Sequence, residues 1–190
     1  SGIQISVKSN CMTRSVAFSA KNSKILHQID KALPNYFDDM QSVVKTTSSF
    51  AKLQKFHTEI IGNQYFVRFS FDTKDAAGHN MATKASDALM KWFLDKFSDM
   101  GLKYVSISAN ICTDKKVSAV NSILGRGVHV TAEILIPKDI CKKYLKTTPE
   151  KIVDLHIRKN LMGSIAAGSL RSANAHVANM LLAFYLATGQ

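Results

Sequence analysis

The feature that most constrains the fold is a β-hairpin in the first half of the chain. Two runs rich in aromatic and β-branched residues, 56–61 and 64–71, are separated only by Gly62 and Asn63. A two-residue Gly-Asn connection is typical of a tight hairpin turn, because glycine adopts the positive φ that such turns require. Residues 66–70 alternate, so we expect one face of the second strand to be buried and the other to face water.

Helical patterns flank this hairpin on both sides. Residues 22–44 carry apolar side chains at helical spacing, interrupted by Pro34, and residues 80–99 carry an apolar stripe with Gly101 as a natural stop. Residues 105–108 then have the pattern of another strand. The first hundred residues are therefore expected to form an α+β sandwich, in which helices pack against a sheet.

A domain boundary is expected near Ser106. Beyond it the pattern predicts a polar turn, a strand and three helical segments, in the order 110–116, 128–136, 138–146, 149–160 and 174–187. Residues 180–187 are the longest apolar stretch, far shorter than a membrane span, and no secretory signal is visible. We expect a cytoplasmic location, with an anchor elsewhere in a longer parent chain left open.

The charge balance favours anionic partners. Lys and Arg number 25 against 14 Asp and Glu, a net charge of +11, which attracts nucleic acid, lipid headgroups or phosphorylated cofactors. The charge is dispersed along the chain, which argues against a nucleic-acid arm. Cys11, Cys112 and Cys141 are widely spaced and form no C-x-x-C pair, so reduced thiols are expected rather than disulfides or a zinc site.

The segment 75–80, Asp-Ala-Ala-Gly-His-Asn, lies between the hairpin and the long helix. Its small residues would let the backbone approach a ligand, and a helix start attracts phosphate. Taken alone, an ordinary helix entry capped by Asp or Asn is the favoured interpretation.

Two other segments leave alternatives open. In 110–116, Asp114 followed by Lys115 and Lys116 fits a solvated turn as well as it fits a lysine that stabilises developing negative charge. The run 125–127, Gly-Arg-Gly, is better explained as a structural turn than as a phosphate nest.

A last polar group lies near the C-terminal end. His176 and Asn179 are three residues apart and share a face of the predicted helix. A lone histidine there is more often a satisfied polar group than a ligand. No second histidine lies at metal-ligand spacing, so no metal site is predicted.

Taken together, eight segments in order resemble the 3-hydroxy-3-methylglutaryl-CoA (HMG-CoA) reductase family, of the type found in eukaryotes and some bacteria. The resemblance covers essentially the whole chain. The matching pieces are Met12-Thr-Arg14, Phe50-Ala-Lys-Leu-Gln-Lys-Phe-His-Thr58, Asp75-Ala-Ala-Gly-His-Asn80, Cys112-Thr-Asp-Lys-Lys116, Gly125-Arg-Gly127, Leu145-Lys-Thr-Thr148, Lys159-Asn-Leu-Met-Gly-Ser164 and Asn174-Ala-His-Val-Ala-Asn179.

The resemblance implies reduction of HMG-CoA to mevalonate and CoA with two NADPH. It implies that residues 1–14 are a remnant of a larger α+β substrate domain and that residues 15–106 are a ferredoxin-like NADP(H)-binding small domain inserted in it. Residues 107–190 would hold the catalytic loop and part of the substrate domain, which binds CoA.

The resemblance also implies residue roles. Lys115 matches the catalytic lysine, whose cation can stabilise alkoxide-like transition states. Positions that bind the substrate, whose carboxylate calls for cations, are matched by Arg14, Ser108, Asp114, Lys116, Lys146, Lys159, His176 and Asn179. Positions that bind the cofactor are matched by Ser48, Phe50, Asp75, Ala77, Gly78, His79 and Asn80.

The chain departs from the family pattern in two places. Ser49 stands where many relatives carry an arginine that helps with the 2′-phosphate of the cofactor, so NADH remains an option beside NADPH. His79 replaces a small or apolar residue. The family's catalytic Glu, Asp and His fall outside these 190 residues, so we expect this fragment alone to turn over no substrate.

Further expectations concern partners. The family places its active site between protomers, so a dimer or tetramer is expected, with no nucleic acid and no membrane contact from this segment. One alternative is a non-catalytic NADP- or CoA-binding fragment. A remote alternative is an RNA-binding α+β module that stacks bases on Tyr65, Phe66 and Phe69, although core packing explains these aromatics better.

Overall fold

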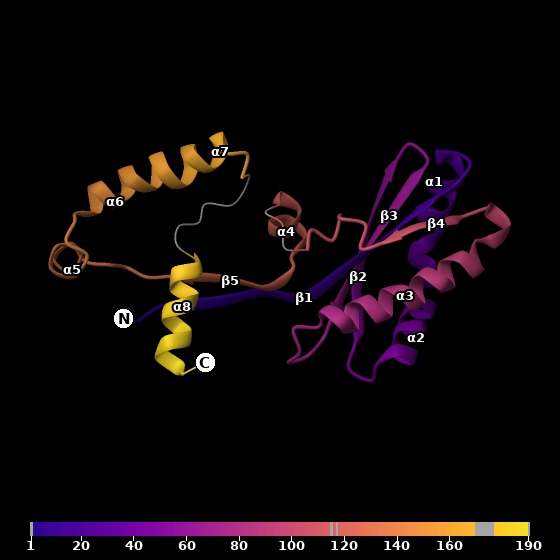
Figure 1. Ribbon diagram of the computed structural model, residues 1–190, viewed down its shortest axis with the longest axis horizontal. Coiled ribbons are helices and arrows are strands. Elements are labelled where there is room, and N and C mark those ends of the chain that lie inside the picture. Colours follow the sequence, from indigo (N-terminus) through magenta and orange to yellow (C-terminus); the bar gives the residue numbers. More distant parts are fainter. Residues whose placement is uncertain (1, 115, 117, 170–176, 190) are drawn as a thin grey trace. The chain divides into compact units, whose positions relative to one another are not determined.

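The computed structural model describes residues 2–114, 116, 118–169 and 177–189. The chain forms two compact units. The sheet unit comprises residues 5–116 and 123–131, and the helical unit comprises residues 1–4, 117–122 and 132–190. Helices and strands follow one another along the sheet unit, whereas the helical unit consists mainly of helices (Figure 1), and the chain is therefore of the α+β class predicted from the sequence.

The sheet unit is built on an antiparallel sheet. Its elements are β1 (Gln4–Ser19), α1 (Ser23–Ala32), a 3-10 turn (Leu33–Tyr36), α2 (Phe37–Thr47), β2 (Lys52–Ile61), β3 (Gln64–Asp72), α3 (His79–Lys96), a 3-10 turn (Ser98–Met100), β4 (Lys103–Ile107) and β5 (Gly127–Glu133). The strand order is β2-β3-β1-β4, and β5 pairs with β1. The β2/β3, β3/β1 and β1/β4 pairs are all antiparallel.

The predicted hairpin is confirmed. Ile61 pairs with Gln64 at the closed end of the β2/β3 ladder. Gly62 occupies the turn with φ of +60°, a conformation that costs glycine little because it has no Cβ.

β1 is an element that the sequence pattern missed, since no strand was expected before residue 22. It lies at the centre of the sheet, where Met12 to Ser19 pair with Phe71 to Gln64 of β3 and the same strand pairs with β4. Thr13 and Ser15 are buried together with Val16 and Phe18. A strand buried on both faces loses the alternation that identifies a half-exposed strand.

Helices complete the core of the sheet unit. Pro34 divides the helical region expected at 22–44, because it lies in the 3-10 turn between α1 and α2. Asn22 caps α1 by accepting a 3.2 Å hydrogen bond from the amide of Ile25. On α3, Phe93 stacks on Phe18 of β1 at 5.2 Å between ring centroids, so the apolar stripe of α3 packs on the sheet as predicted.

The expectation that one face of β3 would be wet is wrong at its C-terminal half. Arg68 and Ser70 are each only 1% exposed. The turn that precedes β5 covers this face, and the Nη2 of Arg68 donates a 2.8 Å hydrogen bond to the main-chain oxygen of Gly125. A long-range contact of this kind leaves no trace in the local pattern.

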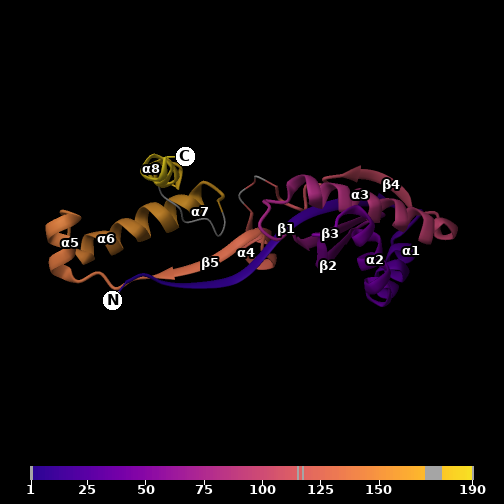
Figure 2. The ribbon, with the colours of Figure 1, turned by 90° about the horizontal axis from the view of Figure 1, so that it is seen from below.

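The helical unit contains short helices in succession. They are α5 (Lys138–Tyr144), α6 (Pro149–Leu155), a π-helical stretch (His156–Gly163), α7 (Ser164–Ala166) and α8 (Val177–Thr188), and α4 (Ala119–Leu124) lies where the chain passes between the units. Figure 2 follows the run from α5 to α7. The helices expected near 138–146 and 149–160 are confirmed, and of the helix expected at 174–187 residues 174–176 lie outside the described part.

Two predictions from composition can be compared with the fold. Cys11, Cys112 and Cys141 are buried and free, as expected for reduced thiols. Among the described residues, no helix is both long enough and apolar enough to span a bilayer.

Candidate active site

A cluster of charged side chains lies beside β1 in the sheet unit. The Nη1 of Arg14 donates a 2.8 Å hydrogen bond to the Oγ of Ser108, which lies 94 residues further along the chain. Another contact joins the same Nη1 to the Oδ2 of Asp114 at 3.7 Å. The fold thus brings together three of the residues predicted to bind the substrate.

Arg126 is a fourth member of this cluster, and it is not among the residues predicted from the sequence to bind substrate or cofactor. Its Nη2 donates to the Oδ1 of Asp114, while its Nη1 donates to the main-chain oxygen of Thr13 at 3.1 Å and to the Thr13 hydroxyl at 3.0 Å. The side chains of Arg126 and Arg14 are only 10% and 12% exposed. In the sequence Arg126 stands between two glycines, a pattern that favours a structural turn over a binding residue.

The cluster carries excess positive charge, because two guanidinium groups face one carboxylate. Burial alone would raise the pKa of Asp114, but the hydrogen bond and charge of Arg126, followed by the charges of Arg14 and His79, outweigh it and hold that pKa below its usual value. The Nε of Arg14 is buried and has no hydrogen-bond partner among the described residues. The cluster therefore carries the positive charge that an anion would require.

The loop that supplies Ser108 and Asp114 has an unusual backbone. Ser108, Asn110 and Thr113 have φ of +60°, +63° and +52°, a region that non-glycine residues rarely adopt. Ser15 of β1 holds the loop, because its main-chain oxygen accepts from Ala109 at 3.2 Å and its Oγ accepts from the amide of Cys112 at 3.1 Å. Strain that the surroundings enforce is typical of functional loops.

The lysines of this loop are only partly described. The Nζ of Lys116 donates a 2.8 Å hydrogen bond to the Oδ1 of Asn110, so its charge stays at the loop. Lys115, predicted to be the catalytic lysine, lies outside the described residues. The substrate-site residue His176 lies outside them as well.

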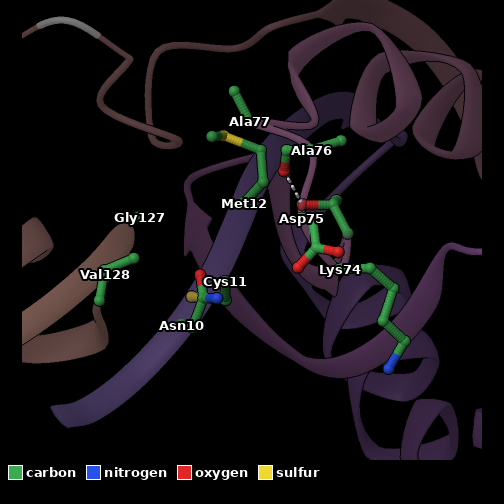
Figure 3. A pocket seen from close by; sticks show the side chains of 10 residues that line it. Asn10, Cys11, Met12, Lys74, Asp75, Ala76, Ala77, Gly127 and Val128 are labelled. Atoms are coloured by element: carbon green, nitrogen blue, oxygen red, sulfur yellow. Dashed lines mark hydrogen bonds between the residues drawn. The ribbon is translucent and has the colours of Figure 1, made fainter.

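A cavity of about 510 Å³ lies next to this cluster in the sheet unit. Its walls are residues 10–12 of β1, the loop 73–77 and residues 127–128 at the start of β5. In Figure 3 the loop and Val128 lie on opposite sides of β1. Asp75 and Ala77, two of the predicted cofactor residues, line the cavity.

Gly78 fixes the shape of the loop at the start of α3. It has φ of +80°, and a Cβ placed on it would lie 2.4 Å from the Cγ2 of Thr73. The Thr73 hydroxyl in turn donates a 2.8 Å hydrogen bond to the main-chain oxygen of Ala76. Only glycine fits such a position.

The loop at α3 and the charged cluster are neighbours. His79 and Asn80, two further predicted cofactor residues, form the first turn of α3. Met12 lines the cavity, and its Sδ lies 3.0 Å from the Nη1 of Arg126 in the charged cluster. The cavity that the predicted cofactor residues line and the charged cluster are thus adjacent within one unit.

Ser48 and Phe50, also predicted to bind the cofactor, lie after α2 and do not line the cavity. The Oγ of Ser48 accepts hydrogen bonds from the amides of Phe50 and Ala51, at 3.1 and 3.3 Å. The side chain of Phe50 is 62% exposed.

The remaining predicted site residues belong to the helical unit, and the structure does not bring them together. Lys146 borders a shallow hollow of about 360 Å³ together with Lys142 and Lys151. Lys159 borders another of about 240 Å³ on the π-helical stretch. Asn179 lies on α8. In the described part of the chain no group of three or more His, Cys, Asp or Glu could hold a metal ion.

Comparisons with solved structures give partial matches. A class II HMG-CoA reductase from Streptococcus pneumoniae, solved bound to NADPH, matches with a TM-score of 0.48 and 18% sequence identity, over 60% of this chain and 32% of that chain. A second structure of the enzyme from the same organism gives the same TM-score and covers 28% of that chain.

Comparisons of sequence are more extensive. The chain is 40% identical to the HMG-CoA reductases of Aeropyrum pernix and Pyrococcus horikoshii over all of its length, but it spans only 44% and 45% of theirs. It is 46% identical to the enzyme of Phycomyces blakesleeanus over 80% of this chain and 13% of that enzyme. The family model described as hydroxymethylglutaryl-coenzyme A reductase matches residues 1–190. The chain therefore belongs to the hydroxymethylglutaryl-coenzyme A reductase family.

Proposed function

We propose that the protein reduces HMG-CoA to mevalonate and CoA with NADPH, and that the Arg14–Asp114 cluster binds the acyl group. The observation that carries this proposal is that the charged cluster borders the cavity lined by Asp75 and Ala77, because Met12 lines that cavity and its Sδ lies 3.0 Å from the Nη1 of Arg126. A reductase needs its acyl substrate and its hydride donor side by side, because hydride transfer requires contact between them.

The cluster suits the acyl end of HMG-CoA. The substrate carries a terminal carboxylate, and the guanidinium of Arg14 offers that group a charge-assisted hydrogen bond. Ser108 fixes the guanidinium through its 2.8 Å contact. Asp114 stays ionised, so it accepts hydrogen bonds from hydroxyl groups of the substrate.

The cavity and the loop suit a dinucleotide. Ala76, Ala77 and Gly78 leave the loop backbone accessible to a phosphate at the start of α3. The element order β-α-β-β-α-β and the strand order β2-β3-β1-β4 are those of a ferredoxin-like domain, which supports residues 15–106 as the cofactor domain. When bound, NADPH supplies the hydride. Ser49 leaves NADH as a second donor to compare.

We assign the chemical step to Lys115. It directly follows Asp114, whose carboxylate is held in the cluster, and it precedes Lys116. An ammonium group at this position would stabilise the negative charge that develops on the thioester oxygen as hydride arrives. Lys115 would then act twice, once for each hydride transfer.

The helical unit is assigned to the rest of the substrate. We propose residues 107–190 as the catalytic loop and part of the domain that binds CoA, with roles for Lys146, Lys159, His176 and Asn179. The three lysines around the hollow at Lys146 would attract phosphates of CoA. Self-association as a dimer or tetramer, with the site between protomers, and a cytoplasmic location belong to the same proposal.

The RNA-binding alternative requires exposed aromatic rings on the hairpin, and two of the three rings it names are not exposed. Tyr65 and Phe69 are fully buried in the core of the sheet unit. Bases cannot stack on rings that are covered by α1 and α3.

A turnover assay on the full-length protein tests the proposed function. We expect oxidation of NADPH that depends on HMG-CoA, with mevalonate identified as the product by mass spectrometry. Binding of NADPH and HMG-CoA without turnover would instead indicate the non-catalytic binding module. The same assay on the 190-residue chain alone is expected to show no turnover.

A further inference from the structure

Arg126 makes more polar contacts within the cluster than any predicted site residue that the structure describes. It reaches Asp114 with one terminal nitrogen and Thr13 with the other, and the second nitrogen also lies 3.0 Å from the Sδ of Met12. Its side chain is only 10% exposed. A buried guanidinium with this many partners is fixed in place, whereas a surface arginine exchanges among conformers.

The two arginines share Asp114 unequally. Arg126 donates a hydrogen bond to Oδ1, whereas Arg14 lies 3.7 Å from Oδ2 and gives its hydrogen bond to Ser108 instead. Without Arg126, the carboxylate of Asp114 would lose its hydrogen-bonding partner in a half-buried setting. Arg14 would be the nearest cation to replace that partner, because a buried carboxylate without a partner is costly.

A residue of β3 holds the backbone next to Arg126 through a hydrogen bond. Arg68, 1% exposed, donates to the main-chain oxygen of Gly125 at 2.8 Å. Gly125 has φ of +86°, and a Cβ there would lie 3.1 Å from the Oγ of Ser9. The turn therefore has little freedom, and the guanidinium of Arg126 is presented to Asp114 in one orientation.

We propose that Arg126 is a positioning residue that holds Asp114 and so keeps Arg14 available to the carboxylate of the substrate. This inference rests on the proposed function, since it takes an anionic acyl group as the ligand of Arg14. Arg126 acts through Asp114 and Arg14 and needs no contact with the reacting atoms.

The test uses the full-length protein with Arg126→Gln, Arg126→Lys and a control, Arg158→Gln. Arg158 pairs with Asp154 on an exposed helix surface, so the control removes an Arg–Asp pair outside the cluster. Calorimetry measures the affinity for 3-hydroxy-3-methylglutarate, the free diacid, which requires no turnover. Kinetics then measure KM for HMG-CoA and for NADPH separately.

We expect Arg126→Gln to weaken diacid binding by about tenfold or more, as for the loss of a hydrogen bond to a charged group. KM for HMG-CoA rises with it, while KM for NADPH stays near that of the control, and the unfolding temperature falls below that of the control because a buried ion pair is broken. Arg126→Lys keeps the charge but loses the fork geometry, so its affinity falls between those of the wild type and Arg126→Gln.

Other outcomes overturn the inference. The inference fails if the diacid affinity is unchanged in Arg126→Gln, or if Arg126→Lys binds the diacid no more tightly than Arg126→Gln does. It also fails if the wild type does not bind the diacid. If Arg126→Gln does not fold, Arg126→Lys decides alone, and unchanged affinity rejects the inference. Failure of the proposed function is separate, because it appears as absent turnover in a wild type that binds the diacid.

Discussion

The buried guanidinium of Arg68 donates a 2.8 Å hydrogen bond to the main-chain oxygen of Gly125. This contact joins the middle of the sheet to the turn that carries Arg126. Burial holds the pKa of Arg68 below its usual value, with partial compensation from Cys11 and Cys112. Arg68 is thus a structural residue, and we expect its removal to loosen the turn that positions Arg126 in the charged cluster.

Arg68→Met should destabilise the protein, because it leaves the oxygen of Gly125 buried without this donor. We expect the free energy of unfolding to fall by about 1–3 kcal/mol. Denaturant unfolding followed by circular dichroism measures the change, with Arg158→Met as the exposed control, for which less than about 0.5 kcal/mol is expected. Equal stability of the two variants would show that the Gly125 contact contributes nothing.

Gly78→Ala should damage the loop at the start of α3. The added Cβ would lie 2.4 Å from Thr73, and the backbone at φ of +80° disfavours any side chain. We expect NADPH affinity to fall while the rest of the sheet unit keeps its fold. Gly101→Ala is the matched control, because Gly101 has φ of +70° but open space around it. If Gly101→Ala lowers the NADPH affinity as much as Gly78→Ala does, backbone strain alone, about 1 kcal/mol, explains the effect.

Asp114→Asn should change how stability depends on pH. The pKa of Asp114 is lowered in the folded state, so its contribution is present above the unfolded pKa of about 3.9 and is lost as pH falls through the folded value. The stability gap between wild type and Asp114→Asn should therefore be constant near neutral pH and close in acid. Asp154→Asn, which breaks an exposed pair with Arg158, serves as the control. A stability gap between wild type and Asp114→Asn that widens in acid would show that the pKa of Asp114 is not lowered in the folded state.

Tyr65→Phe tests the core of the sheet unit. The Tyr65 hydroxyl donates a 2.9 Å hydrogen bond to Asp30 of α1, and burial, followed by the charge of Asp30, raises the pKa of Tyr65 well above its usual value. Since a raised pKa stabilises the fold below the unfolded value of about 10, the variant should be less stable by about 1–2 kcal/mol at neutral pH. The difference should shrink at strongly alkaline pH. A stability difference between wild type and Tyr65→Phe that stays constant up to strongly alkaline pH would mean that Tyr65 ionises as readily in the folded state as in the unfolded state.

Much of the fold could be predicted because its signals are local. The hairpin followed from the Gly62-Asn63 turn between two apolar runs, and α3 from its apolar stripe. β1 could not be predicted, because its first residues are exposed and its second half is buried on both faces. The burial of Arg68 was missed for a related reason, since Gly125 covers it from 57 residues away.

The candidate site depended on resemblance rather than on spacing. Arg14 and Ser108 are 94 residues apart, and nothing in either segment indicates that they meet. Asp114 alone fitted a solvated turn as well as it fitted a binding site. Arg126 was missed because an arginine between two glycines has the local pattern of a turn, and its partner Asp114 lies on a separate loop.

The most direct measurement is the rate of NADPH oxidation that depends on HMG-CoA in the full-length protein, compared between wild type, Arg14→Met and Arg158→Met. The account predicts that the wild type is active and that Arg158→Met has an unchanged rate. It predicts that kcat/KM of Arg14→Met falls by about 100-fold or more, because Arg14 makes a charge-assisted hydrogen bond to the carboxylate of the substrate. A wild type without this activity, or an Arg14→Met variant as active as wild type, would contradict the assignment of the charged cluster as the substrate site.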